Sequence, residues 1–120
     1  MPIERGRPSL RADLFGGSGG VKVWDLLAGV SMEPFTAVLS CELAPAGVVG
    51  RHRQEAFPEI VLGLEGDGVA NVDGTEQPLG PGDVVWLPLG SFLALRNRSD
   101  QSPLRYLIIK ARDTGGVTPR

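Results

Sequence analysis

Short apolar runs separated by turn residues cover the chain from residue 21 onward. Within these runs the apolar positions alternate with polar ones or follow one another directly, a pattern that indicates β-strands. Glycine, proline, aspartate or asparagine bounds each run and interrupts every stretch long enough for a helix. We therefore predict strands near residues 21–28, 35–43, 59–65, 68–72, 76–79, 83–87, 92–97 and 104–110.

Turn chemistry supports the same interpretation. The dipeptide Asp73-Gly74 lies between two of the predicted strands and is a strong signal for a two-residue hairpin. Gly66 and Gly74 each follow a strand, where a positive φ is expected. About eight short strands without helices are typical of an all-β sandwich or barrel. The pattern alone does not choose between an immunoglobulin-like sandwich, a lipocalin-like barrel and a jelly roll.

The length of 120 residues fits a single domain, and 42% hydrophobic residues are enough for a packed core. We expect a flexible N-terminal arm over 1–20, because residues 16–20 are nearly all glycine. The barrel is then expected over 21–112, and a flexible C-terminal tail over 113–120.

Charge and cysteine content exclude several classes of function. The formal net charge is -2, which argues against a nucleic-acid surface. No apolar run approaches the roughly 20 residues needed to cross a bilayer, and the N-terminus does not look like a signal peptide. We therefore expect a cytoplasmic protein. The single cysteine, Cys41, allows no intramolecular disulfide and is expected to be a small buried hydrophobe.

Residues 45–66 carry a spaced set of residues that resembles the first motif of the cupin superfamily. That motif is a glycine, five residues, His-x-His, three or four residues, a glutamate, six residues and a glycine. The corresponding positions are Ala46, His52, Gln54, Glu59 and Gly66. Glutamine therefore stands at the second histidine position, and alanine stands at the opening glycine position.

Residues 82–97 resemble the second cupin motif, which is a glycine, five residues, Pro-x-Gly, two residues, a histidine, three residues and an asparagine. The matching positions are Gly82, Pro88, Gly90 and Asn97. Leu93 stands at the histidine position. Two motifs in this order, with a hairpin between them, resemble a small single-domain cupin over about residues 35–110. The resemblance implies an all-β, double-stranded β-helix (jelly-roll) barrel.

In cupins the motif histidines and carboxylate hold a divalent metal inside the barrel. Side-chain alternation predicts that His52, Gln54, Glu59 and Leu93 share one pocket. The resemblance makes the first three candidate ligands for one Mn, Fe, Ni or Zn ion. His52 and Glu59 are also candidate catalytic acid–base groups. Because Leu93 offers no ligand, the alternative of a metal-free hydrogen-bonded cluster of the three polar side chains is favoured over a bound metal.

Three functions follow from this site. The first is the binding of a small organic molecule in the barrel, with a degenerate metal site and no assignable reaction. The second is a metal-dependent enzyme of the dioxygenase, isomerase, decarboxylase or lyase type, using His52, Gln54 and Glu59. The third, a sensory or structural module, has no supporting motif. Aromatic candidates for ligand contact are Trp86, Phe92 and Tyr106.

A row of apolar residues is expected to face away from the pocket. If Glu59 points inward, alternation turns Ile60, Leu62 and Leu64 to the outer face of the same strand. An exposed apolar row is unfavourable unless another surface covers it. We therefore expect a homodimer, to which the N-terminal arm contributes by exchange, and no nucleic-acid or membrane partner.

Overall fold

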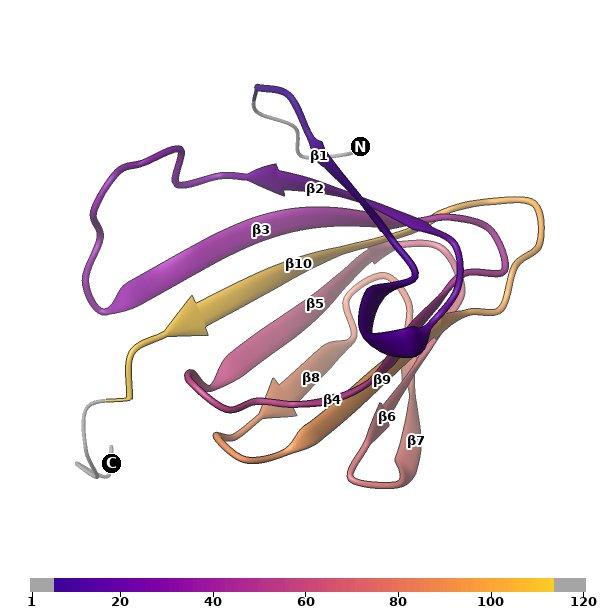
Figure 1. Ribbon diagram of the computed structural model, residues 1–120. Helices are drawn as coiled ribbons and strands as arrows, with labels where there is room; N and C mark the ends of the chain where they lie inside the picture. The colour runs from indigo at the N-terminus through magenta and orange to yellow at the C-terminus, as the bar shows by residue number, and fades with distance from the viewer. Residues whose placement is uncertain (1–5, 114–120) are drawn as a thin grey trace.

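Ten strands form two sheets in the computed structural model, which describes residues 6–113 (Figure 1). One sheet has the strand order β1-β2-β3-β10-β5-β8, and the other has the order β4-β9-β6-β7. The elements are β1 (Ser9–Ala12), the 3-10 turn η1 (Leu14–Gly16), β2 (Gly20–Asp25), β3 (Phe35–Leu43), β4 (Val48–Arg53), β5 (Glu59–Glu65), β6 (Gly68–Val72), β7 (Thr75–Leu79), β8 (Val84–Leu87), β9 (Phe92–Asn97) and β10 (Leu104–Ala111).

The core lies between the two sheets. Paired strands are antiparallel throughout, and buried and more exposed side chains alternate along β5, β8 and β9, as the period-two pattern predicted. The larger sheet contributes Val21, Cys41, Leu43, Val61, Val85, Leu87, Leu104 and Tyr106 to the core. The smaller sheet contributes Val49, Ala70, Leu79, Leu93 and Leu95. This arrangement is the jelly-roll barrel that the motifs implied.

All eight predicted strands are present, and four of them, β3, β5, β6 and β9, have the predicted bounds. β2 ends at Asp25 rather than at residue 28, because the Asp25 carboxylate accepts the backbone N–H groups of Leu27 and Ala28 in a turn. β4 was not predicted as a strand, since Gly50 and the charged residues after it weaken its apolar pattern. The tail prediction for 113–120 falls outside the described residues, except for Asp113.

The motif turns adopt the conformations that their residues favour. Asp73 and Gly74 have φ values of 51° and 91° and join β6 to β7 through the pair Val72–Thr75. The predicted positive φ is also found at Gly66, with a value of 106°. Ala46, at the opening glycine position of the first motif, has a φ of 58°, so an alanine there occupies a left-handed conformation that glycine adopts more easily.

The N-terminal segment is part of the barrel wall. Residues 9–12, which were expected to lie in a flexible arm, instead form β1 and pair with β2, and η1 then crosses in front of β4 (Figure 1). Ser18 and Val48 exchange two backbone hydrogen bonds of 2.9 and 2.8 Å. A Cβ atom placed on Gly50 would lie 1.8 Å from the Phe15 carbonyl oxygen. The sequence can therefore bring η1 against β4 only because residue 50 has no side chain.

The motif asparagine has a structural role. The buried Asn97 side chain donates to the carbonyl groups of Leu43, Ala44 and Ser102 at 3.3, 3.1 and 2.8 Å. Its Oδ1 atom accepts the Ser99 backbone N–H at 3.0 Å. These bonds join the β3–β4 turn to the β9–β10 loop, so the role of Asn97 is to hold the fold together. Within the described residues, no helix is long or apolar enough to cross a bilayer.

Candidate functional site

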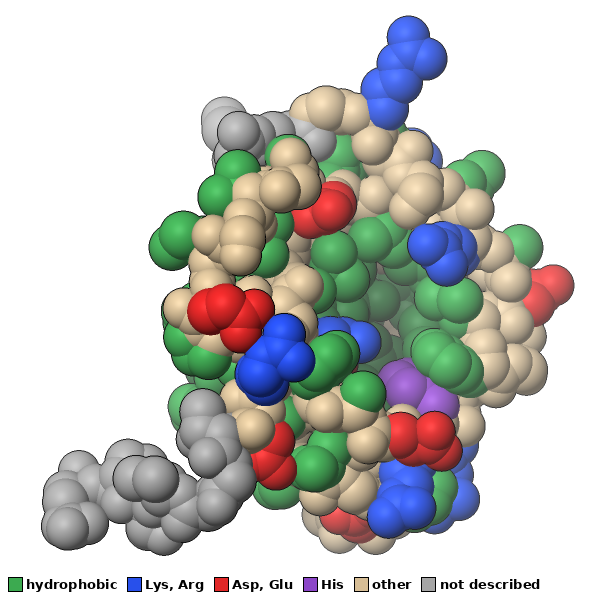
Figure 2. All heavy atoms as spheres, turned by 60° about the vertical axis from the view of Figure 1, so that its left-hand side comes forward, with side chains coloured by type: hydrophobic (Ala, Val, Ile, Leu, Met, Phe, Trp, Pro, Cys, Tyr) green, Lys and Arg blue, Asp and Glu red, His purple; other side chains and the backbone are tan. Residues whose placement is uncertain are grey.

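A cavity of about 410 Å³ lies between the two sheets. Figure 2 shows it as a hollow with hydrophobic side chains along its walls and a histidine at its edge. Its apolar walls come from Leu14, Val21, Val23, Leu39, Cys41, Val49, Leu93, Leu95 and Ile108. Its polar lining consists of Arg11, His52, Arg53, Gln54, Glu55, Glu59, Tyr106 and Lys110. A mainly apolar space of this size with a few polar groups is typical of a small-molecule site.

The four residues singled out at the motif positions do share this cavity. His52 and Gln54 come from the end of β4 and the residue after it, while Glu59 begins β5. Leu93 lies on β9 directly across from His52. The alternation argument placed all four correctly, although their roles in binding or catalysis stay predictions.

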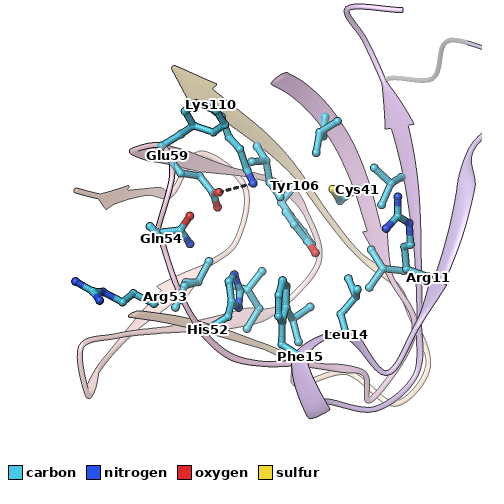
Figure 3. Close-up of a pocket in the computed structure, with 18 of the residues that line it drawn as sticks. Arg11, Leu14, Phe15, Cys41, His52, Arg53, Gln54, Glu59, Tyr106 and Lys110 are labelled. Carbon is cyan, nitrogen blue, oxygen red and sulfur yellow. Dashed lines mark ion pairs between the residues drawn. The ribbon is translucent and has the colours of Figure 1, made fainter. Parts of the chain in front are cut away.

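His52 is held by its neighbours on one side of the cavity. Its Nδ1 atom lies 2.8 Å from the Gly50 carbonyl oxygen, so Nδ1 carries the proton and Nε2 is the acceptor in the neutral ring. The imidazole stacks on Phe15 of η1 with a centroid distance of 3.9 Å (Figure 3). Burial lowers the pKa of His52, which favours the neutral ring.

Glu59 is paired with a lysine that the sequence analysis did not single out. Lys110 lies directly across from Glu59 on β10, and its Nζ atom is 3.6 Å from Glu59 Oε1 (Figure 3). The Glu59 side chain is only 3% exposed. Burial raises the pKa of the Glu59 carboxyl group, and the Lys110 ammonium partly opposes this effect. The only sequence signal for Lys110 was its place two and four residues after Ile108 and Tyr106 on one strand face.

Two buried polar side chains of the cavity have no partner among the described residues. Gln54 is 4% exposed, and its Nε2 atom makes no hydrogen bond. Tyr106 is 2% exposed and lines the same cavity, and no hydrogen bond of its hydroxyl is found within residues 6–113. Figure 3 shows this hydroxyl pointing across the cavity toward Leu14 and Phe15. Since burial raises the pKa of Tyr106 well above its ordinary value, the hydroxyl keeps its proton.

The hydrogen-bonded cluster of His52, Gln54 and Glu59 considered from the sequence is therefore wrong. His52 bonds to a backbone carbonyl, Glu59 pairs with Lys110, and the Gln54 side chain has no partner among the described residues. The three groups line one cavity without satisfying one another.

The aromatic candidates divide between the cavity and the outer surface. Tyr106 lines the cavity, whereas Trp86 is 65% exposed on the outside of the larger sheet. Phe92 lies under the Arg51 guanidinium, 3.9 Å from the ring centroid. Cys41 is buried as expected, and burial raises the pKa of its thiol to about 12. A thiol of this kind is protonated near neutral pH and is a poor nucleophile.

The residues that line the cavity fit a metal ion poorly. Within residues 6–113, no group of three or more His, Cys, Asp and Glu side chains lies close enough to hold one. His52 and Glu59 are the remaining strong ligand types at the motif positions, and Leu93 contributes only hydrocarbon. The Lys110 ammonium already stands beside the carboxylate, where a divalent cation would meet its repulsion.

The fold and cavity define a small jelly-roll barrel with a ligand-sized interior. The Cupin domain family matches residues 39–110, which is more than half of the chain. The protein therefore belongs to the cupin family, as the two motifs indicated. No curated protein matches the sequence.

Several solved structures share the fold. A protein of Thermotoga maritima, described as a predicted oxalate decarboxylase, is 26% identical with a TM-score of 0.83, covering 92% of this chain and 99% of its own. A Cupin 2 conserved barrel domain protein of Salinispora arenicola is 26% identical with a TM-score of 0.70, covering 93% and 91%. A sugar phosphate isomerase from a cupin superfamily, of Silicibacter pomeroyi, is 25% identical with a TM-score of 0.67, covering 92% and 72%.

Proposed function

We propose that this cupin binds a small organic molecule in the cavity between its sheets, without a metal ion. The observation that carries the proposal is the cavity of about 410 Å³, whose mainly apolar walls enclose the buried, unpartnered Gln54 Nε2 atom and the Tyr106 side chain. Buried polar groups are nearly always hydrogen-bonded. Unpartnered groups that line a cavity are therefore well placed to bind the polar atoms of a ligand.

The pair of Glu59 and Lys110 supports binding without a metal. An ammonium at this place neutralises the buried carboxylate, as a bound cation would. The chain thus carries its own positive charge where the family motif would place a metal. The Lys110 ammonium also offers three N–H donors to the cavity, of which one points toward Glu59.

A two-part experiment tests this function. Elemental analysis of protein purified without a His-tag or chelator is expected to find far less than one metal per chain. A fragment library of acids, amides, alcohols and sugars is then screened by protein-observed NMR, and hits are expected to shift the signals of cavity residues.

The control is Leu39→Trp, which places a larger side chain on a cavity wall. Hits that bind this variant as well as the wild type do not occupy the cavity, and such a result would refute the proposed site. A stoichiometric metal that is lost together with binding in His52→Ala would refute the metal-free part.

The second candidate is the metal-dependent enzyme anticipated from the motifs. It is favoured by His52 and Glu59, which share the cavity, and by the unprotonated Nε2 atom of the neutral His52 ring. In this case Mn, Fe, Ni or Zn would be held by His52, Gln54 and Glu59, and the Lys110 ammonium would have to move or lose its proton. Metal content again distinguishes the two candidates.

We also propose a homodimer through the outer face of the larger sheet. There a groove of about 310 Å³ is lined mainly by Phe35, Ile60, Trp86 and Ile109, and the Trp86 side chain at its edge is 65% exposed. An exposed Trp86 side chain and a groove on the same face allow a symmetric interface, in which each copy inserts its Trp86 side chain into the groove of the other. The proposed occupant is therefore a second copy of this chain.

Light scattering at micromolar concentration tests the dimer. The wild type is expected to have the mass of two chains, and Trp86→Glu the mass of one. Leu89→Glu is the control, because Leu89 is also an exposed apolar residue but does not line the groove. A monomeric wild type, or a Trp86→Glu variant that stays dimeric, would contradict the proposal. The cytoplasmic location stays a prediction from the sequence.

A further inference from the structure

We propose that the ligand of the cavity is a monocarboxylate with an apolar body, bound as its anion with the carboxylate held by Arg11. This inference rests on the proposed function, because it names the chemical class of the molecule that the cavity binds. It depends on three features of the lining: its excess positive charge, the place of each charge, and the buried donors that have no partner.

Positive charge exceeds negative charge around the cavity. The lining contains three cationic side chains, Arg11, Arg53 and Lys110, against two carboxylates, Glu55 and Glu59. His52 adds no charge near neutral pH, because burial lowers its pKa. One positive charge is therefore left over when all five groups are ionised, and a monoanion balances it.

Arg11 is the cation that remains available. Lys110 is committed to Glu59 at 3.6 Å, and Arg53 Nε donates to the Gly90 carbonyl oxygen at 3.4 Å. The Arg11 side chain has no hydrogen-bond or ion-pair partner within residues 6–113, although its backbone pairs with β2. A ligand carboxylate placed at Lys110 would meet the Glu59 carboxylate, whereas within residues 6–113 no carboxylate forms an ion pair with Arg11. The planar guanidinium also matches a carboxylate with two parallel hydrogen bonds.

The remaining lining accounts for the apolar body. Arg11 and the pair of Gln54 and Glu59 stand on opposite walls (Figure 3), with hydrocarbon side chains between them. The Tyr106 hydroxyl points toward the wall that carries Leu14 and Phe15. The ligand that satisfies this lining has a carboxylate at one end and a hydrophobic middle. An acceptor oxygen at its far end would additionally bond to Gln54 Nε2.

Matched pairs of acids and amides test the inference, because each pair has nearly the same shape and differs in charge. The probes are hexanoate and hexanamide, phenylacetate and phenylacetamide, and para-acetylbenzoate and para-acetylbenzamide. Affinities are measured by NMR titration near neutral pH and low salt. At least one acid is expected to bind roughly tenfold more tightly than its amide, as a charge-assisted contact provides.

Two variants locate the source of any preference. Arg11→Gln keeps an exposed polar side chain on β1 and is expected to abolish the preference for the acid while the amide still binds. Arg7→Gln makes the same change of charge in the same segment but outside the cavity, and is expected to keep the preference.

Each outcome decides a different claim. Acids and amides that bind equally, at the cavity, overturn the inference and leave the proposed function standing. A preference for acids that survives in Arg11→Gln also overturns the inference, because the carboxylate is then held elsewhere. If no acid or amide binds the wild type at millimolar concentration, the inference is overturned, and the proposed function then depends on the alcohols and sugars of the fragment screen.

Discussion

Replacing Gln54 by leucine distinguishes a binding role of this side chain from a structural role. The free energy of unfolding should rise if the side chain serves a ligand, and should fall if it stabilises the free protein. The side chain is 4% exposed, and its Nε2 atom has no partner within the described residues. The backbone of residue 54 bonds to Ser91 and Gly90 at 2.8 Å in both cases, and these bonds do not depend on the side chain. The substitution therefore removes a buried amide and leaves the local backbone as it is.

The expected change follows from the cost of an unsatisfied buried donor, which is about 1–3 kcal/mol. Leucine has a similar volume and adds apolar contacts with its neighbours. We expect Gln54→Leu to raise the free energy of unfolding by about 1 kcal/mol, which corresponds to a rise in Tm of roughly 4 °C for a domain of this size. The same variant should bind cavity ligands with an acceptor oxygen more weakly than the wild type.

Urea denaturation followed by tryptophan fluorescence measures the stability. Gln77→Leu is the matched control, because Gln77 lies on β7 and does not line the cavity. A loss of more than about 1 kcal/mol in Gln54→Leu, with no such loss in the control, would show that the amide is satisfied in the free protein. The reasoning that assigns Gln54 to a ligand would then be wrong.

Three further predictions concern the motif positions. His52 is the only histidine, so its NMR titration is unambiguous; its pKa should lie below the usual value of about 6.5. Stability should consequently fall as the pH drops below about 6.5 toward the folded-state pKa, where the unfolded chain binds more protons, and His52→Gln should remove this loss. Ala46→Gly should raise the free energy of unfolding by up to about 1 kcal/mol, since residue 46 has a φ of 58° and is exposed; a decrease in urea denaturation would contradict this. Leu93→His places an imidazole across from His52. By calorimetric zinc titration, Leu93→His combined with Lys110→Gln should bind zinc at least tenfold more tightly than Leu93→His alone, and equal affinities would show that the ammonium does not oppose a cation.

Much of the fold was predictable because it depends on local rules. Period-two alternation located β5 and β9 with their inward faces, so Glu59 and Leu93 were assigned correctly to the interior. The hairpin at Asp73-Gly74 follows from residues that tolerate a positive φ. β1 was missed because its four residues are too few to show a period, and η1 because it leads into a glycine-rich segment and depends on the close approach of Phe15 to Gly50.

The sequence by itself determined the family, the barrel, and the replacement of two motif histidines by Gln54 and Leu93, because each of these follows from residue types at fixed spacings. Only the tertiary structure decided which charges meet in the cavity. Lys110 reaches Glu59 through the register of β10 on β5, and Arg11 reaches the cavity through the pairing of β1 with β2. Alternation tells which face a side chain is on, but contacts between distant strands depend on register, which the packing of the whole barrel sets.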